Sequence, residues 1–207
     1  MVYPDSDGDG YGRADAGARF CTVSDGWVES SGDCDDGDSS INPGVRETCD
    51  GYDENCNNVI DDGASDCGCI QRNLGTHSYL FCNDQKQWWD ARDSCDERNY
   101  LLATISSIEE HRWILGEIRD DPAITNREHW IGLNDLGREG DWSWVSGDSY
   151  SYRGWASRQP DNARWWVGPT YGEDCVETNR WRGRDAPSDW NDNPCNTNTR
   201  FICEAGP

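Results

Sequence analysis

The sequence predicts an α+β fold in which two helices are followed by short antiparallel strands and long loops, after a small, acidic, loop-rich segment. Three observations predict it. Apolar residues recur at helical spacing in only two stretches, the later apolar runs are short and divided by Gly, Asn, Asp and Pro, and 11 cysteines are spread along 207 residues. Disulfides and metal ions are expected to stabilise the first segment.

The net charge is strongly negative and unevenly distributed. The chain has 40 acidic and 18 basic residues and a formal net charge of −22, and 17 of the acidic but only 3 of the basic residues lie in residues 1–66. Nucleic-acid phosphates would be repelled, so cations are the expected partners. The asymmetry predicts two domains, residues 1–66 and residues 67–207.

Cysteine usage indicates the compartment. So many cysteines without a CxxC pair are typical of an oxidising environment, so we expect a secreted, extracellular protein. No stretch approaches the roughly 18 apolar residues of a membrane span. No secretory signal opens the sequence, and we expect one to have been removed before Met1.

The elements follow in order along the chain. Residues 1–66 lack apolar periodicity, and disorder is the alternative to disulfide and metal stabilisation there. Residues 78–82 predict a strand, 86–98 a helix with Trp88, Ala91 and Cys95 on one face, and 100–105 a short strand. A capping box at residues 107–110 begins a second helix, which ends near Arg119 before Asp121-Pro122. The last predicted strands are residues 130–133, 142–145, 175–178 and 200–204.

Three loop motifs carry the chemistry. Gln159-Pro160-Asp161, Gly172-Glu173-Asp174-Cys175 and Trp190-Asn191-Asp192 supply carboxylates and side-chain amides, which are the hard oxygen ligands that Ca²⁺ prefers. An ion held on exposed loops keeps open coordination positions that two neighbouring sugar hydroxyls can fill. The motifs therefore predict carbohydrate binding rather than catalysis.

Residues 67–204 resemble the C-type lectin domain. The resemblance rests on these three motifs, on Trp130-Ile131-Gly132-Leu133 and on Phe201-Ile202-Cys203-Glu204. It implies a fold of two helices, short antiparallel strands and calcium-binding loops, with Pro160 in a cis peptide bond. The principal calcium ligands that it implies are Gln159, Asp161, Glu173, Asn191 and Asp192, the last also through its backbone oxygen. A second calcium position is implied at Asp135, Glu139, Asn162 and Asp174.

The order Gln-Pro-Asp implies a sugar class. Within this family it resembles galactose or N-acetylgalactosamine binding, whereas Glu-Pro-Asn resembles mannose or glucose binding. An aromatic ring usually stacks on the apolar face of galactose, and Trp165 and Trp166 are available; the alternative is that both anchor the loop. We expect four other tryptophans of this part in the core: Trp130, Trp144, Trp155 and Trp190.

Residues 3–63 resemble the MopE-type metal-binding domain of secreted bacterial proteins. The matching motifs are residues 3–12, 32–36, 42–44 and 47–62. Alternating acids predict three oxygen-ligand loops, which favour Ca²⁺ over the Cu²⁺ that the family name suggests. The first comprises Asp5, Asp7, Asp9 and the Tyr11 carbonyl, and lacks the bidentate acid because Ala16 holds the twelfth position. The second comprises Asp53, Asn55, Asn57, the Val59 carbonyl and Asp61, and the looser third comprises Asp36, Asp38, Ser40 and Glu47.

Cysteine spacing suggests the pairs Cys21–Cys34 and Cys49–Cys56. The lectin resemblance implies Cys95–Cys203 and Cys175–Cys195. Cys82 then pairs with Cys67 or Cys69, with a slight preference for Cys69, and the cysteine left over is free or joins a second chain in an oligomer.

The expected function is calcium-dependent binding of galactose-type glycans, with residues 1–66 as a metal-stabilised spacer. The alternatives are a calcium-stabilised protein-interaction or adhesion module, and metal scavenging by the first segment. We do not expect an enzyme, because His77, His111 and His129 fit no catalytic motif and the acidic residues are explained as calcium ligands.

Overall fold

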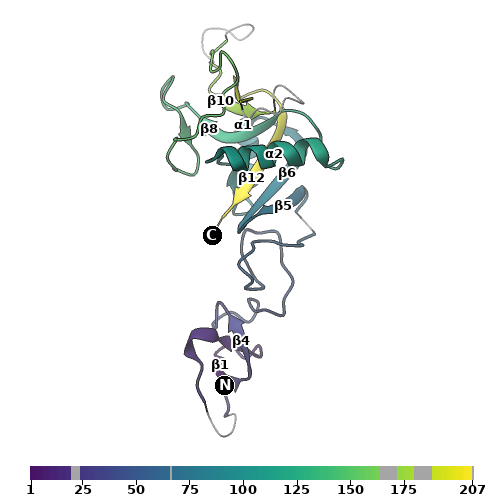
Figure 1. The fold of residues 1–207 in the computed structure, drawn as a ribbon, viewed down its shortest axis with the longest axis vertical. Coiled ribbons are helices and arrows are strands. Elements are labelled where there is room, and N and C mark those ends of the chain that lie inside the picture. The colour runs from purple at the N-terminus through teal and green to yellow at the C-terminus, as the bar shows by residue number, and fades with distance from the viewer. Residues whose placement is uncertain (20–23, 66, 164–171, 180–187, 207) are drawn as a thin grey trace.

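An eight-stranded sheet with a helix on each face forms the larger part of the molecule (Figure 1). The computed structural model describes residues 1–19, 24–65, 67–163, 172–179 and 188–206. The central strands run in the order β11, β10, β8, β12, β6, β5, while β7 pairs with β12 and β9 pairs with β8. Their bounds are β5 Ile70–Leu74, β6 His77–Lys86, β7 Leu101–Leu102, β8 His129–Asn134, β9 Ser143–Trp144, β10 Cys175–Thr178, β11 Asn191–Asn193 and β12 Thr199–Ala205.

Alternation along the strands divides the core between the two faces of the sheet. In β6, Tyr79 and Phe81 point toward one apolar cluster and Leu80 and Cys82 toward the other, because successive strand residues face opposite sides. Helix α1 (Trp88–Asp96) covers the Leu80 side, and α2 (Ile108–Asp120) covers the Tyr79 side. The predicted α+β fold is confirmed.

The strand pairing departs from the expectation in two places. β12 pairs with β8 in parallel, whereas all neighbours were expected to be antiparallel. The strand predicted over residues 100–105 is only Leu101–Leu102, because the backbone N–H of Thr104 donates to the Glu204 carboxylate at 2.8 Å instead of extending the pairing. β5 and β11 were not predicted, since both consist mainly of polar residues.

The second helix begins at the predicted cap. The Ser107 hydroxyl accepts from the backbone N–H of Glu110 at 3.2 Å, which satisfies one of the free donors of the first turn. The reciprocal half of the box differs, because the Glu110 carboxylate accepts from the backbone N–H of Ser106 at 2.8 Å. None of the described helices has the length and apolar character that a membrane span requires.

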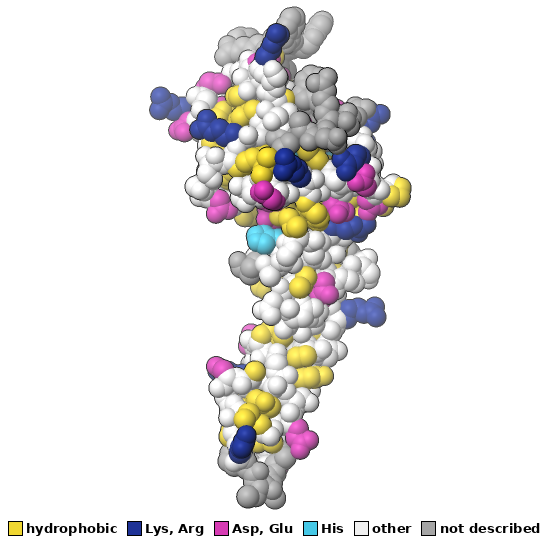
Figure 2. All heavy atoms as spheres, viewed as in Figure 1, with side chains coloured by type: hydrophobic (Ala, Val, Ile, Leu, Met, Phe, Trp, Pro, Cys, Tyr) yellow, Lys and Arg dark blue, Asp and Glu magenta, His cyan; other side chains and the backbone are white. Residues whose placement is uncertain are grey.

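The N-terminal part is narrow and has little apolar core (Figure 2). Val2 is the one buried hydrophobic residue among the described residues that precede Ile60. Two small sheets form it, one pairing β1 with β3 and the other pairing β2 with β4 in parallel. Their bounds are β1 Tyr3–Pro4, β2 Tyr11–Arg13, β3 Trp27–Val28 and β4 Ser30–Asp33, with a 3₁₀ turn η1 at Ala14–Ala16.

The narrow part is attached to the broad part by packing and hydrogen bonds. Ile60 is buried in the same apolar cluster as α1. Asp61 is fully buried and accepts from the Tyr100 hydroxyl, whose oxygen also forms a hydrogen bond with the Ser78 hydroxyl. The Asn99 amide donates to the backbone oxygen of Asp50 at 3.0 Å. Residues 47–65 therefore lie against the fold that follows them.

Five disulfides join the described cysteines, and two of the predicted pairs are wrong. Cys34 pairs with Cys56 rather than Cys21, and Cys49 pairs with Cys67 rather than Cys56, because the chain path brings distant cysteines together where sequence spacing favoured near ones. Both Cys67 and Cys69 are paired, so neither is left over; Cys21 lies outside the described residues. The bonds are Cys34–Cys56, Cys49–Cys67, Cys69–Cys82, Cys95–Cys203 and Cys175–Cys195.

Candidate functional site

Trp190 fixes the position of the segment that carries the Gln-Pro-Asp triplet. Its backbone N–H donates to Gly154 and its carbonyl accepts from Ala156, both at 2.9 Å. The indole is fully buried and packs edge to face against Trp144 and Trp155. Because Asn191 and Asp192 follow Trp190 directly, this packing places them beside residues 159–161.

Asp192 organises the turn that follows the triplet. The peptide bond between Gln159 and Pro160 is cis, as the family resemblance implied. One carboxylate oxygen of Asp192 accepts from the backbone N–H of Asp161 at 3.1 Å, and the other accepts from that of Asn162 at 2.7 Å. Asn162 has a φ of +45°, a left-handed conformation that asparagine tolerates better than most residues.

Three carboxylates then converge. Oxygen atoms of Asp161, Glu173 and Asp192 all lie within 4.8 Å of one another. Burial raises the pKa of Glu173 to about 7, and the charges of Asp192 and Asp161 add to this effect; burial also raises the pKa of Asp192. A proton or a cation is therefore needed to stabilise these groups together, and their oxygens are suitable calcium ligands.

The two predicted amide ligands differ in their surroundings. The side-chain oxygen of Gln159 is buried and has no hydrogen-bond partner among the described residues, as expected of an atom that serves an ion. The Asn191 amide nitrogen donates to the Glu177 carboxylate at 3.1 Å and to the backbone oxygen of Asp192 at 2.7 Å. The second bond uses the backbone oxygen of Asp192, which the family resemblance implies as a calcium ligand.

Glu177 is a site residue that sequence reasoning missed. It is buried in β10, opposite Asn191 in the register with β11, and it accepts from the amides of both Asn191 and Asn193. Its signal in the sequence is an acid within an otherwise apolar strand. These bonds use the amide nitrogen of Asn191, so they do not involve its side-chain oxygen, which is the predicted ligand atom.

The second predicted calcium position adjoins the first. Asp135 is buried, one of its oxygens accepts from the backbone N–H of Gly140 at 2.7 Å, and the other has no partner among the described residues. Burial, followed by the charges of Glu139, Asp174 and Asp192, raises the pKa of Asp135 to about 6. Asn162 joins the two positions, since its amide donates to the Glu139 carboxylate and its oxygen accepts from the backbone N–H of Glu173.

Gly172 provides a test of this packing. A Cβ at Gly172 would lie 2.7 Å from an Asp174 carboxylate oxygen and 2.8 Å from the Asn162 amide oxygen, closer than real contacts allow. We expect Gly172→Ala to displace these groups and to weaken calcium binding by about tenfold or more, as is usual when groups that orient metal ligands are disturbed. Isothermal titration calorimetry with Ca²⁺ measures the calcium affinity of the variant.

The matched control for Gly172→Ala is Gly137→Ala, where an added Cβ meets nothing within 4 Å. This control should bind calcium as the wild type does. Equal calcium affinity in the two variants would contradict the assigned packing.

The predicted stacking tryptophans, Trp165 and Trp166, lie outside the described residues. Of the tryptophans expected in the core, Trp130, Trp144 and Trp190 are buried and Trp155 is partly buried. Among the histidines, His111 and His129 are fully buried, and a ring nitrogen of His111 lies 2.9 Å from the Asp189 carboxylate. The His111 ring also packs against Trp190, in the cluster that Trp190 forms with His111, Trp144, Tyr152 and Trp155.

The second N-terminal loop is closed by a different acid from the one predicted. Asp53 accepts from the backbone N–H groups of Asn57 and Asn58, and Asn58 has the expected positive φ of +66°. The amides of Asn55 and Asn57 both donate to Asp62, whereas Asp61 lies in a separate group with Glu47 and Glu54.

The looser third loop is only partly brought together. Asp38 accepts from the Ser40 hydroxyl, whereas Asp36 bonds to Ser6 and Glu47 belongs to the group around Asp61. The first loop keeps its predicted arrangement, with oxygens of Asp5, Asp7 and Asp9 within 4.8 Å of one another.

Comparison with protein families and solved structures agrees with this geometry. The family model for the lectin C-type domain matches residues 84–205, and that of a MopE-type metal-binding motif matches residues 33–62. The C-type lectin domain family 4 member M of the gibbon Symphalangus syndactylus is 34% identical over 129 residues, which are 61% of this chain and 26% of that protein. This chain thus spans about a quarter of such a relative.

Solved structures share the fold at similar identity. The carbohydrate-recognition domains of the mouse and human scavenger receptor C-type lectins are each 32% identical to this chain and cover 66% of it, with TM-scores of 0.55 and 0.57 over 95% and 96% of those chains. The herring type II antifreeze protein matches at 28% identity and a TM-score of 0.54, over 66% of this chain and 96% of its own. The matched family model shows that the chain belongs to the C-type lectin domain family, and the converging acids and the shared fold agree with this.

Proposed function

We propose that the protein is a secreted, calcium-dependent lectin that binds terminal galactose or N-acetylgalactosamine. The observation that carries the proposal is the convergence of Asp161, Glu173 and Asp192, together with the buried side-chain oxygen of Gln159, which has no partner among the described residues. Lectin domains among its relatives support carbohydrate binding in general. Calcium, sugar class and secretion are the finer parts of the proposal.

The residues themselves define what the site does. Asp161 and Glu173 would provide charge and ligand oxygens to a calcium ion, and Gln159 and Asn191 would provide neutral ligand oxygens. Asp192 holds the backbone turn and would add a further ligand oxygen. A Ca²⁺ ion held in this way would offer coordination positions to two adjacent sugar hydroxyls, whose protons the carboxylate oxygens would accept in hydrogen bonds, and no covalent bond would be made or broken.

The sugar class rests on the order of the triplet. Gln159 precedes and Asp161 follows the proline, which places the amide and the acid in the order that the family resemblance associates with galactose-type sugars. A glycan array with and without EDTA tests this directly. We expect galactose-terminated glycans to bind in Ca²⁺ and to be released by EDTA. Binding that survives EDTA, binding of mannose-type glycans only, or no glycan binding would overturn the proposal, and the last would favour a protein-interaction module.

The calcium site also predicts a pH dependence. Without the ion, the raised pKa of Glu173, about 7, means that this carboxyl carries a proton in acid solution. The ion must displace that proton, so calcium affinity should fall as the pH decreases below about 7, by about tenfold per pH unit for each proton displaced. Above about pH 7 the affinity should level off. Calcium titrations between pH 8 and pH 5 measure the slope, and a constant affinity over this range would contradict it.

We further propose that residues 1–66 form a metal-stabilised spacer domain before the lectin domain of residues 67–207. The poor apolar core of the first part supports this, since cross-links and ions must replace hydrophobic burial there. The five disulfides are consistent with an extracellular location. Useful avidity for glycans would require several copies, because one such site binds a single sugar weakly.

A further inference from the structure

Three carboxylates in the N-terminal part each have one buried oxygen without a partner. In Asp7, Asp9 and Asp33, one oxygen accepts from the backbone N–H two residues further on, at 3.2, 2.8 and 2.8 Å respectively. The other oxygen of each is buried and has no hydrogen-bond partner among the described residues. Buried carboxylate oxygens are costly unless something positive or a donor faces them, so the pattern points to a missing partner common to the three.

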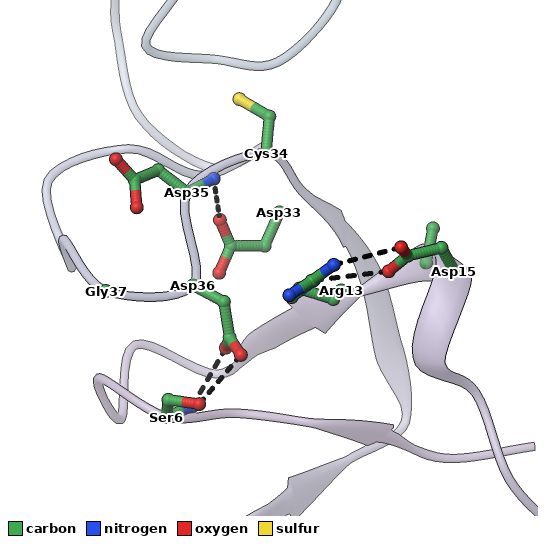
Figure 3. A pocket seen from close by; sticks show the side chains of 9 residues that line it. Ser6, Arg13, Asp15, Asp33, Cys34, Asp35, Asp36 and Gly37 are labelled. Carbon is green, nitrogen blue, oxygen red and sulfur yellow. Dashed lines mark hydrogen bonds and ion pairs between the residues drawn. The ribbon is translucent and has the colours of Figure 1, made fainter.

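The strand pairing brings Asp33 to the segment that directly follows the loop of Asp7 and Asp9. Strand β4 ends at Asp33 and pairs in parallel with β2, where Arg13 lies opposite Asp33. The Asp36 carboxylate accepts from both the backbone N–H and the hydroxyl of Ser6, at 2.8 and 2.7 Å (Figure 3). Asp33 itself is only 6% exposed, so it is enclosed between the two segments.

No described cation supplies the missing positive charge. Arg13 and Asp33 line a common pocket, but the Arg13 guanidinium turns to Asp15, with which it forms two hydrogen bonds at 3.2 and 2.9 Å (Figure 3). Among the described residues, no ion pair involves Asp7, Asp9 or Asp33. Burial raises the pKa of Asp33, and the charges of Asp9 and Asp7 raise it further, which agrees with a set of acids held close without compensation.

We propose that Asp33 completes a calcium site begun by Asp5, Asp7 and Asp9. In the loop by itself the twelfth position is Ala16, so the carboxylate that usually closes such a loop is absent; the geometry supplies it from β4 instead. Oxygen-only donors exclude a soft metal and favour Ca²⁺. The match to the metal-binding motif begins at residue 33 and so takes in Asp33 but not the loop of residues 5–11.

The site would join two segments that little else holds together. Because Val2 is the one buried hydrophobic residue in the described part before Ile60, an ion between the first loop and β4 replaces an apolar core. The β2–β4 pairing, and with it the backbone at Arg13, should then depend on calcium. This consequence concerns residues 1–46 and is independent of sugar binding.

The first test counts ions on the full chain by native mass spectrometry, comparing wild type, Asp33→Asn and Asp35→Asn. Asp35 is the matched control, since it is exposed, lies two residues away and loses the same charge on substitution. We expect Asp33→Asn to bind one Ca²⁺ fewer than the other two proteins at equal free calcium. The same count in all three would overturn the proposal.

The second test follows tryptic cleavage after Arg13 in Ca²⁺ and in EDTA, read by intact mass. Wild type and Asp35→Asn should be protected by calcium, whereas Asp33→Asn should be cut at similar rates in both conditions. In EDTA, Asp33→Asn should be cut more slowly than wild type, because removing the charge relieves repulsion among the acids. A destabilised fold would instead be cut faster in both conditions. The proposal would be overturned if calcium protected Asp33→Asn from trypsin at the same midpoint calcium concentration as the wild type.

Discussion

Replacing Asp161 with alanine is expected to abolish sugar binding while leaving the disulfide-bonded fold intact. Asp161 is exposed, and its side chain contributes a ligand oxygen to the group formed with Glu173 and Asp192. Loss of one carboxylate from a calcium site removes both charge and a donor, so we expect at least about a hundredfold weaker calcium binding and no measurable glycan binding. Calcium titration and a galactose-affinity column measure the two effects.

The control is Asp84→Ala, an exposed acid on β6 that belongs to no acidic group in the described residues. It changes the net charge equally and should bind calcium and galactose as the wild type does. Urea unfolding in EDTA should give nearly the same midpoint for all three proteins. Retention of wild-type sugar affinity by Asp161→Ala would show that the site is assigned to the wrong residues.

Replacing Trp190 with alanine is expected to have the largest effect on stability. The side chain is fully buried, and its ring centroid lies 5.4 to 6.0 Å from those of His111, Trp144, Tyr152 and Trp155. Large-to-small changes at such positions cost about 3–5 kcal/mol, mainly through the cavity left behind. Because Asn191 and Asp192 follow directly, calcium affinity should fall as well. Urea unfolding with the disulfides intact measures the free energy.

Trp89→Ala is the control for this change. Trp89 is 38% exposed at the start of α1 and contacts Trp88 and Arg92, so its loss should cost about 1 kcal/mol or less. Calcium should partly restore the stability of Trp190→Ala, since an ion that binds only the folded protein stabilises it by mass action. Equal stability of the two variants would contradict the role assigned to the Trp190 cluster.

Much of the broad part was predictable because its signals are local. The alternation of Tyr79, Leu80 and Phe81 follows from strand geometry, and the Ser107 cap identifies the start of α2 within one residue. The group formed by Asp161, Glu173 and Asp192 was recognisable because the motifs place several oxygen donors within a few residues. The cis bond before Pro160 followed from the family resemblance.

The features that sequence reasoning missed depend on contacts between distant segments. Strand β11 is Asn-Asp-Asn and resembles a loop, yet it pairs with β10 because the Trp190 cluster holds it there. The parallel pairing of β12 with β8 depends on the order of strands across the sheet, which spacing along the chain does not reveal.

The N-terminal part was the least predictable for the same reason. Asp61 and Asp62 are neighbours with identical side chains, but one is fully buried against Tyr100 and the other is exposed. The pairing of Asp33 with Arg13 across β4 and β2 could not be predicted, because the chain between them carries no pattern that indicates it. The predicted pairing of Cys34 was wrong for the same reason, because Cys34 bonds to Cys56, which is 22 residues away.

The disulfides of the narrow part also determine how the molecule would carry a mechanical load. If a bound sugar and the first strands are pulled apart, tension crosses from Cys34 to Cys56, from Cys49 to Cys67 and from Cys69 to Cys82 through sulfur bridges, bypassing much of the backbone between them. The slack available for stretching is therefore small, and the segment would act as a short, stiff tether. Reducing agents would convert it into a long, extensible one.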